Sequence, residues 1–414
     1  MVPLLGGNGV SMAAETAERA RRGRRVLPLA IVFAAAAAAV AAGLFADRAS
    51  KHSAPVPEAT AVSRALPQAP IAGRLGEAAV WTGRELIVAG GLNRRSDGTF
   101  RAVGDGAAYD PAAGRWRKIA PPPAGVGAGA VWTGRELVTW TGNMPVGPAV
   151  GAVYDPRTNI WRRLPTGPLG PREGNANVWA GEELLVIGGY SGDALATPVA
   201  AAVDPATGSW RVLHGLDRLA LFGGPNGAVW DGREAVIAGT LSLCPQKGSA
   251  CARSRPIAVA YNPATDRIRE LRLPSAPLGA ETAGSLTPLA WTGSEVIFRA
   301  SAAGSLRVLT YAPATGRWQT GSRAPCALPH GSDTQTVWAG NRLVVPCGAG
   351  ALQIYDPAAR SWERLTLVPG ATPLDSAAGS AAAWTGTRIV VWSGWTFRRF
   401  NPTPADGDTL TLPE

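Results

Sequence analysis

Side chains that could bind a metal or catalyse a reaction are sparse in this sequence and are not grouped. Metal-binding histidine pairs commonly lie about three to five residues apart, whereas the histidines here are at positions 52, 214 and 330. No set of a nucleophile, a base and an orienting acid stands out either. The sequence therefore predicts no metal and no other cofactor, and it does not identify an active site.

The cysteines favour disulfides over metal binding. Cys244 and Cys251 enclose a short polar segment, CPQKGSAC, and Cys326 and Cys347 form a second pair of sequence neighbours. The paired CxxC spacing of a zinc site is missing. We predict the disulfides Cys244–Cys251 and Cys326–Cys347; a zinc site and free thiols are the alternatives.

A Trp-x-Gly turn between apolar runs recurs seven times and indicates the fold. Successive copies are 46 to 61 residues apart, and a period of about 50 residues is typical of propeller blades. The copies begin at Trp81, Trp132, Trp179, Trp230, Trp291, Trp338 and Trp384.

Each repeat follows the same order of four strands. An apolar strand ends at the Trp, the x-Gly forms a tight turn, and a second apolar strand follows. A third strand ends in a Tyr-Asp-Pro-like turn such as 109–111, and a fourth begins near a Trp such as Trp116. One such sheet cannot bury both of its faces unless neighbouring sheets cover them. The sequence therefore predicts an all-β fold: a seven-bladed β-propeller of four-stranded antiparallel blades over residues 69–414.

The N-terminal region resembles a membrane anchor. Residues 1–25 form a basic tail with five arginines and two glutamates, and residues 26–46 are 21 residues without a charge. A helix of that length spans the hydrocarbon core of about 30 Å. The positive-inside rule keeps the tail in the cytoplasm.

We therefore predict one transmembrane helix (a signal anchor) in the cell membrane, single-pass, with the propeller extracytoplasmic. A flexible linker is expected over residues 47–68. A cleaved signal peptide, which would give a secreted protein, is the alternative. Residues 62–68 resemble the outer strands of later repeats, so part of the linker could pair with the final blade.

These repeats resemble the kelch-repeat β-propeller family, whose superfamily includes the central propeller of galactose oxidase. The resemblance covers residues 69–414 and is clearest where a strand ends in Gly-Gly and an Asp and a Trp follow. The matching residues are Gly90, Gly91, Tyr109, Asp110 and Trp116, and again Gly188, Gly189, Asp204 and Trp210. The chain departs at Ile268, where a Trp is expected. Quinone-cofactor propellers have a similar Asp-Pro-Ala-Thr-Gly-x-Trp pattern, but the repeats of this chain are too long for that family.

The repeated side chains are interpreted first as structural. The seven turn tryptophans are expected to pack between blades rather than stack on sugars, because one packing role explains all of them. The Asp residues before Pro are expected to cap turns rather than bind calcium. Five glutamates recur after the turns and are expected to be solvated or paired with arginine rather than catalytic. They are Glu85, Glu136, Glu183, Glu234 and Glu295.

Strand alternation places the two kinds of repeated turn on one face of the ring, here called the turn face. The opposite face, the loop face, carries loops of variable length, as binding loops on rigid scaffolds do. We therefore expect ligand contacts on the loop face. The candidate residues are Arg94, Arg95, Arg172, Glu173, His330 and Asp333.

Function is predicted only as a class. The formal net charge is +10, but no basic run follows residue 25, so nucleic-acid binding is not expected. We expect a membrane-anchored module that binds or scaffolds a protein or a cell-envelope glycan and is not an enzyme. The resemblance also implies an alternative, a carbohydrate-active enzyme similar to sugar epimerases or mutarotases that uses the central channel. Copper oxidase chemistry is not expected, because the histidine ligands it needs are not grouped.

Overall fold

The computed structural model describes the greater part of the propeller region. The described residues are 58–94, 99–142, 148–172, 174–189, 199–217, 219, 221–242, 254–274, 285–302, 305–326, 336–347, 351–367, 381–393 and 407–413. The predicted tail and transmembrane helix, residues 1–46, lie outside this set. Among the described residues, no helix has the length and apolar character needed to cross a bilayer.

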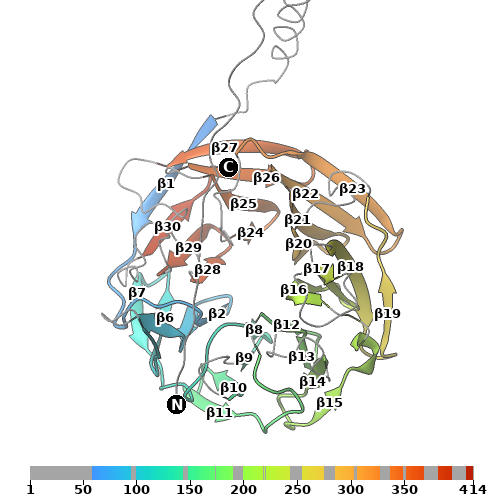
Figure 1. Cartoon of the computed structure of the whole chain (residues 1–414). Coiled ribbons are helices and arrows are strands. Elements are labelled where there is room, and N and C mark those ends of the chain that lie inside the picture. Colours follow the sequence, from blue (N-terminus) through green and yellow to red (C-terminus); the bar gives the residue numbers. More distant parts are fainter. Residues whose placement is uncertain are drawn as a thin grey trace, which may run out of the picture. The chain divides into compact units, whose positions relative to one another are not determined.

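The described strands form seven four-stranded antiparallel blades around a central axis (Figure 1). Five blades are separate sheets, and the last two are joined in one eight-stranded sheet. The seven-bladed propeller predicted from the sequence is therefore confirmed.

The strands are given for each blade from the centre outwards. Blade 1 contains β2 (Ala78–Trp81), β3 (Leu86–Ala89), β6 (Gly106–Asp110) and β7 (Arg115–Lys118). Blade 2 contains β8 (Ala130–Trp132), β9 (Leu137–Thr141), β10 (Val150–Asp155) and β11 (Ile160–Arg163). Blade 3 contains β12 (Ala176–Trp179), β13 (Leu184–Ile187), β14 (Ala200–Val203) and β15 (Trp210–Val212). Blade 4 contains β16 (Leu221–Trp230), β17 (Ala235–Ser242), β18 (Ser254–Asn262) and β19 (Arg267–Glu270).

The remaining blades follow the same order. Blade 5 contains β20 (Ser285–Trp291), β21 (Val296–Ala302), β22 (Ser305–Ala312) and β23 (Arg317–Arg323). Blade 6 contains β24 (Val337–Ala339), β25 (Arg342–Pro346), β26 (Ala351–Asp356) and β27 (Ser361–Leu367). Blade 7 contains β28 (Ala381–Trp384), β29 (Arg388–Trp392), β30 (Gly407–Thr411) and β1 (Glu58–Ala65). A small hairpin of β4 (Leu92–Arg94) and β5 (Phe100–Ala102) extends from blade 1, and a 3₁₀ turn, η1 (His214–Leu216), follows blade 3.

The Trp-x-Gly segments turn the chain between the first two strands of each blade. In blade 1 the Thr82 Oγ1 accepts hydrogen bonds from the backbone N–H groups of Arg84 and Glu85, at 3.2 and 2.9 Å. The seven turn glycines all have positive φ, between 69° and 98°, a region that a side chain would disfavour. The glycine of each Trp-x-Gly segment is therefore needed for the backbone conformation of the turn.

The Asp-Pro turns are capped by their own aspartates, as the sequence predicts. The Asp110 Oδ1 accepts hydrogen bonds from the N–H groups of Ala112 and Ala113, at 2.9 and 3.0 Å. Asp356 does the same with the two residues that follow its proline, at 2.8 and 3.1 Å. These carboxylates are therefore occupied by the turn itself.

The N-terminal strand closes the ring. In β1, residues 58–61 pair in parallel with β27 of blade 6, and residues 62–65 pair antiparallel with β30 of blade 7. β1 thus supplies the outer strand of the last blade. The likeness of residues 62–68 to the outer strands of later repeats suggests this pairing. The pairing also corrects the expected linker, because residues 58–65 form a strand of the propeller.

Between neighbouring blades lie separate apolar clusters. Blades 1 and 2, for example, enclose Val80, Ile87, Leu137 and Tyr154, against which Trp132 packs while partly buried. Each of the other turn tryptophans also contacts one such cluster. The turn tryptophans therefore contribute to packing between blades, and they leave part of their rings exposed on the turn face.

The outer-strand tryptophans connect the blades by hydrogen bonds. The indole N–H of Trp161 in blade 2 donates to the carbonyl of Ala120, which follows blade 1, at 3.0 Å. Trp210 donates to the carbonyl of Pro165, in the link before its own blade, and Trp362 donates to that of Ser322 in β23 of blade 5, each at 3.0 Å. Because an indole N–H needs a partner when its ring packs, these bonds fix the spacing of neighbouring blades.

Candidate functional site

Most of the loop-face candidates lie outside the described residues. Arg95, Glu173, His330 and Asp333 are among them, as are Cys244 and Cys251. Arg94 ends β4, and its side chain is not described. The expected ligand contacts on the loop face therefore stay a prediction for these positions.

Arg172 is described, and it is a buried structural residue with 4% of its surface exposed. Its Nη1 donates to the carbonyls of Gly188 and Val199, at 3.1 and 3.2 Å, and its Nε donates to that of Gly170. The Arg172 guanidinium group thus holds the end of β13 to the start of β14, and a ligand contact at this position stays a prediction.

Arg74 makes the same contacts in blade 1, where it is 1% exposed. Its Nη1 donates to the carbonyls of Gly90 and Asp105, each at 3.2 Å, and to the Asp105 carboxylate at 2.6 Å. Blades 1 and 3 are the two whose second strands end in Gly-Gly. The arginine and the two glycines thus form one structural unit.

The disulfide Cys326–Cys347 is present, with its Cα atoms 5.5 Å apart, and confirms the sequence prediction. Cys347 directly follows β25, and Cys326 lies in the link that enters the same blade. The backbone N–H of Cys326 also donates to the buried Gln353 side chain at 3.2 Å. The link into blade 6 is therefore held covalently and by hydrogen bonding.

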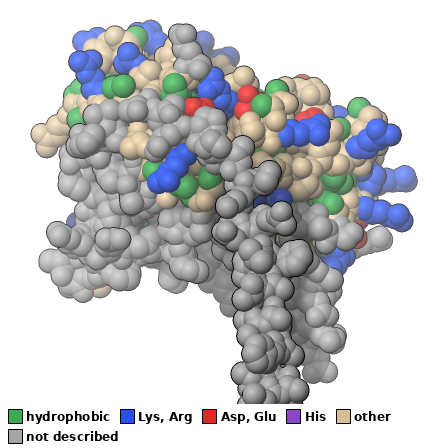
Figure 2. Space-filling model, turned by 90° about the horizontal axis from the view of Figure 1, so that it is seen from above, with side chains coloured by type: hydrophobic (Ala, Val, Ile, Leu, Met, Phe, Trp, Pro, Cys, Tyr) green, Lys and Arg blue, Asp and Glu red, His purple; other side chains and the backbone are tan. Residues whose placement is uncertain are grey.

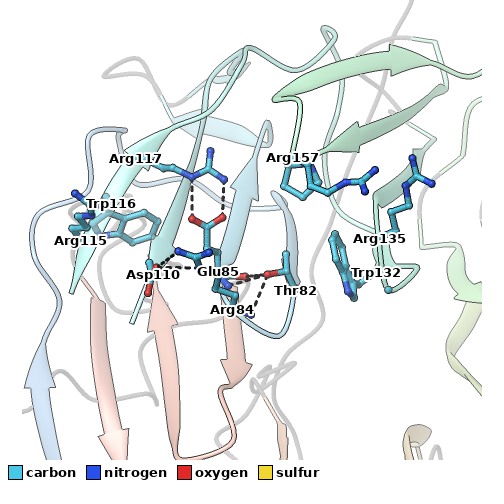
Figure 3. A pocket seen from close by; sticks show the side chains of 12 residues that line it. Thr82, Arg84, Glu85, Asp110, Arg115, Trp116, Arg117, Trp132, Arg135 and Arg157 are labelled. Carbon is cyan, nitrogen blue, oxygen red and sulfur yellow. Dashed lines mark hydrogen bonds and ion pairs between the residues drawn. The ribbon is translucent and has the colours of Figure 1, made fainter. Parts of the chain in front are cut away.

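An open groove of about 930 Å³ lies on the turn face between blades 1 and 2. It is formed by the Trp-x-Gly turns, the Asp-Pro turns and the outer strand β7 (Figure 3). Its charged lining residues are five arginines and two carboxylates: Arg84, Arg115, Arg117, Arg135, Arg157, Glu85 and Asp110. Trp116, Trp132 and Pro156 add apolar surface.

Both carboxylates of the groove already have arginine partners. Glu85 receives two hydrogen bonds from Arg117, at 3.0 and 2.7 Å, and this pairing raises the pKa of the Arg117 guanidinium. Hydrogen bonds from the backbone N–H groups of Ala113 and Ala112, followed by the contact with Arg84, hold the pKa of Asp110 below its ordinary value. Asp110 therefore stays ionised at neutral pH and is unsuited to donate a proton.

The pairing of Glu85 with Arg117 recurs around the ring. Equivalent pairs join the glutamate after the turn to an arginine of the outer strand in blades 2, 3 and 4. The nitrogen–oxygen distances are 3.4 Å for Arg162–Glu136, 2.5 Å for Arg211–Glu183 and 2.9 Å for Arg269–Glu234. The expected arginine-paired ring is therefore present in these blades.

A second pocket of about 680 Å³ adjoins the groove on the turn face, where blade 7 meets blade 1. It shares Arg84 with the groove, and its other arginines are Arg64 and Arg388. Its lining includes no carboxylate, and Trp81 contributes an aromatic side chain.

Several arginines of these pockets have no acidic partner among the described residues. Arg115 and Arg135 in the groove, and Arg64 and Arg388 in the second pocket, make no ion pair there and are exposed. The side of the ring seen in Figure 2 likewise carries many more Lys and Arg than Asp and Glu side chains. The two pockets together form a cationic surface, here called the arginine groove.

A different kind of group lies at the loop-face end of β2. Glu77 is 7% exposed, and neither of its carboxylate oxygens has a hydrogen-bond partner among the described residues. Burial raises its pKa to about 8, against the opposing effects of its own backbone N–H, Arg74 and Ala381. Such a carboxyl group is the kind that can exchange a proton near neutral pH.

Among the described residues, no three His, Cys, Asp or Glu side chains come close enough to hold a metal.

The arginine groove was not expected from the sequence, although its signal was present. The residue after the turn glycine is arginine in the first, second and fourth repeats (Arg84, Arg135 and Arg233), but Glu182 in the third and Ser294 in the fifth. The turn face is therefore uniform in backbone and uneven in charge.

The fold defines the chain as a seven-bladed β-propeller, and solved structures share that fold. One is an oligogalacturonate lyase in complex with manganese, with a TM-score of 0.52 at 11% identity, covering 86% of this chain and 97% of the other. Another is a chain of a mitotic checkpoint complex, with a TM-score of 0.53 at 14% identity, covering 88% of this chain and 98% of the other. No family model and no curated protein sequence matches the chain. At these identities the likeness concerns the fold alone.

Proposed function

We propose that this chain is a binding module of the kelch type rather than an enzyme. The observation that carries the proposal is the arginine groove, an open concave surface on a rigid ring with several arginines free to pair. Its two carboxylates are held in ion pairs, so the groove offers charge and aromatic surface without a proton donor or a nucleophile. The partner class is a protein or a cell-envelope glycan.

The proposal includes display of the propeller on the outer side of the cell membrane by a helix over residues 26–46. The support is the uncharged length of that segment, the arginines before it and the disulfide Cys326–Cys347, which suits an oxidising compartment. Fractionation of expressing cells, with N-terminal sequencing of the recovered protein, tests it. A soluble mature form beginning near Leu44 would contradict the anchor and support secretion.

The second candidate function is a carbohydrate-active enzyme, and Glu77 is the observation that favours it. Its raised pKa and its place at the loop-face end of the innermost strand of blade 1 support this candidate, in which the buried carboxylate oxygens would have to become accessible to a sugar. One solved structure with the same fold is a lyase, so the fold is compatible with catalysis. The likeness supports no particular reaction or substrate for this chain.

One experiment separates the two functions. Full-length protein in lipid nanodiscs is incubated with envelope glycan fractions, and the bound and free sugars are analysed by mass spectrometry. Stoichiometric capture of unchanged material is expected. Turnover that disappears in Glu77→Gln and persists in Arg115→Ser would instead establish the enzyme.

A further inference from the structure

The arginine groove contains more arginines than there are carboxylates in its lining to pair with them. Seven arginines and two carboxylates line the two pockets, and each carboxylate is already paired with one arginine. Arg84 lies in both pockets and is 82% exposed at its side chain. The surplus charge is therefore continuous across blades 7, 1 and 2.

Comparison with other blades shows that the repeat does not require this charge. The position of Arg84 and Arg135 is again arginine in blade 4 (Arg233), but it is Glu182 in blade 3, Ser294 in blade 5, Asn341 in blade 6 and Thr387 in blade 7. The turns of those blades close equally well, so arginine is not needed there for folding. Exposed arginines without partners favour an anionic ligand, because planar guanidinium groups bind carboxylate, sulfate and phosphate.

Aromatic side chains lie beside the arginines and point to a ligand with rings. Trp116 and Trp132 line the groove and Trp81 lines the second pocket, all partly exposed. In Figure 3, Trp132 lies close to Arg135 and Arg157 along one side of the groove. A sugar ring can stack on an indole while an acidic substituent reaches a guanidinium group.

An extended peptide is the competing ligand, because β7 is the outer strand of its sheet and its outer edge pairs with no described strand. The rest of the groove floor is made of hairpin turns whose backbone groups bond within the turn, as in Thr82 and Asp110. The partly exposed tryptophans beside the arginines favour a ligand with sugar rings over a peptide. The two pockets adjoin at Arg84, so a chain of several sugars could contact both.

We propose that the arginine groove binds an anionic polysaccharide, with acidic groups on the arginines and sugar rings on the tryptophans. This inference rests on the proposed binding function and names the ligand class for it. Multivalent contact along the two pockets makes affinity depend on chain length and on salt concentration.

The test uses full-length protein in phosphatidylcholine nanodiscs, with binding measured by biolayer interferometry. The probes are alginate oligosaccharides (carboxylate), dextran sulfate oligosaccharides (sulfate), neutral dextran and poly-glutamate of matched charge. We expect at least one anionic sugar to bind, more weakly at higher salt, with poly-glutamate and dextran much weaker. The carboxylate and sulfate probes distinguish the two acidic groups.

Matched double variants locate the site. Arg115→Ser with Arg135→Ser is expected to lower affinity at least about tenfold, which corresponds to about 1.4 kcal/mol. The control is Arg267→Ser with Arg317→Ser, which removes the same charge from the first residues of β19 and β23, the equivalents of Arg115. The control is expected to stay within about threefold.

The inference would be overturned by equal loss in the control pair, by equal binding of neutral dextran, or by tighter binding of poly-glutamate. Absence of any polyanion binding would also overturn it while leaving the binding module open to another partner. Turnover of a probe without stable capture would instead contradict the proposed function.

Discussion

Arginine has two distinct roles in this propeller, and burial separates them. Arg74 and Arg172 are buried and bond to backbone carbonyls, whereas Arg84 and Arg135 are exposed on the turn face. Burying a guanidinium group is favourable only where hydrogen bonds replace its water. The same residue type thus fixes the chain in one place and offers charge in another.

Replacing Arg172 should therefore affect folding. We expect Arg172→Met to lower the free energy of unfolding by about 2–4 kcal/mol, because the Gly188 carbonyl loses its arginine donor and the Val199 carbonyl keeps only the hydrogen bond from the Gly188 N–H. Arg135→Met is the control and should change stability by less than about 0.5 kcal/mol. Urea denaturation followed by tryptophan fluorescence measures both; equal stabilities would contradict the structural role.

Glu77 should make stability depend on pH. The carboxyl group has a pKa of about 8 in the folded protein and an ordinary value of 4.5, so it is protonated when folded and ionised when unfolded between these values. Its contribution is therefore full below about pH 4.5 and is lost as the pH rises to about 8.

Glu77→Gln should accordingly reduce the fall in unfolding free energy between pH 5 and pH 8, because an amide does not ionise. Denaturation at several pH values measures the change. Glu270→Gln, which makes the same substitution at a side chain that is 53% exposed, is the control for the substitution itself. If the unfolding free energy of the wild type depended on pH as that of Glu77→Gln does, burial would not raise the pKa of Glu77.

At the scale of elements, arginines of the outer strands join neighbouring blades. Arg269 of blade 4 donates to the Tyr311 hydroxyl of blade 5 at 3.0 Å and to Glu234 of its own blade at 2.9 Å. In blade 3 the residue equivalent to that tyrosine is Val203, and there Arg162 donates to the backbone carbonyl of Pro205 at 2.5 Å instead. The inter-blade contact is thus kept although its acceptor changes.

Tyr311→Phe should cost about 0.5–1.5 kcal/mol of unfolding free energy, the usual range for one hydrogen bond. The same substitution in an Arg269→Ala background should cost clearly less, because its partner is already gone. Thermal and urea denaturation of the four proteins gives the coupling energy. Identical costs in the two backgrounds would mean that this bond does not couple the blades.

The disulfide holds the entry to blade 6. Replacing both Cys326 and Cys347 by Ser should destabilise by about 3 kcal/mol in the chain-entropy account, given their separation of 21 residues. Comparison of the oxidised wild type with the double variant under denaturation checks this. A single Cys326→Ser variant, which should match the double one, controls for the loss of a thiol.

Regular features of this fold could be predicted because each is a local backbone requirement. The turn glycines need positive φ, the Asp-Pro turns need a capping carboxylate, and seven copies of one pattern fix the number of blades. Arg172 could not be placed, because its burial depends on how the ends of β13 and β14 meet. The arginine groove was missed for a related reason: its arginines come from different blades that only the closed ring brings together.

At the scale of the whole propeller, closure depends on a strand from the opposite end of the chain. β1 pairs with blade 6 through residues 58–61 and with blade 7 through residues 62–65, and Ala61 is fully buried between them. Arg64 of the same strand lines the second pocket. Ring closure and the arginine groove are therefore linked through one short element.

Removal of β1 should open the ring. A chain starting at residue 67 loses the outer strand of blade 7 and exposes the edge of β30. An exposed strand edge can pair with strands of other chains. We expect a lower melting temperature and concentration-dependent oligomers by light scattering, and weaker binding at the arginine groove. The matched control starts at residue 57, lacks the same upstream segment and keeps β1, so it should melt like the full-length propeller and stay monodisperse. If the two truncated chains melted alike and both stayed monodisperse, β1 would be dispensable, and the contacts between the inner strands of blades 7 and 1 would have to hold the ring by themselves.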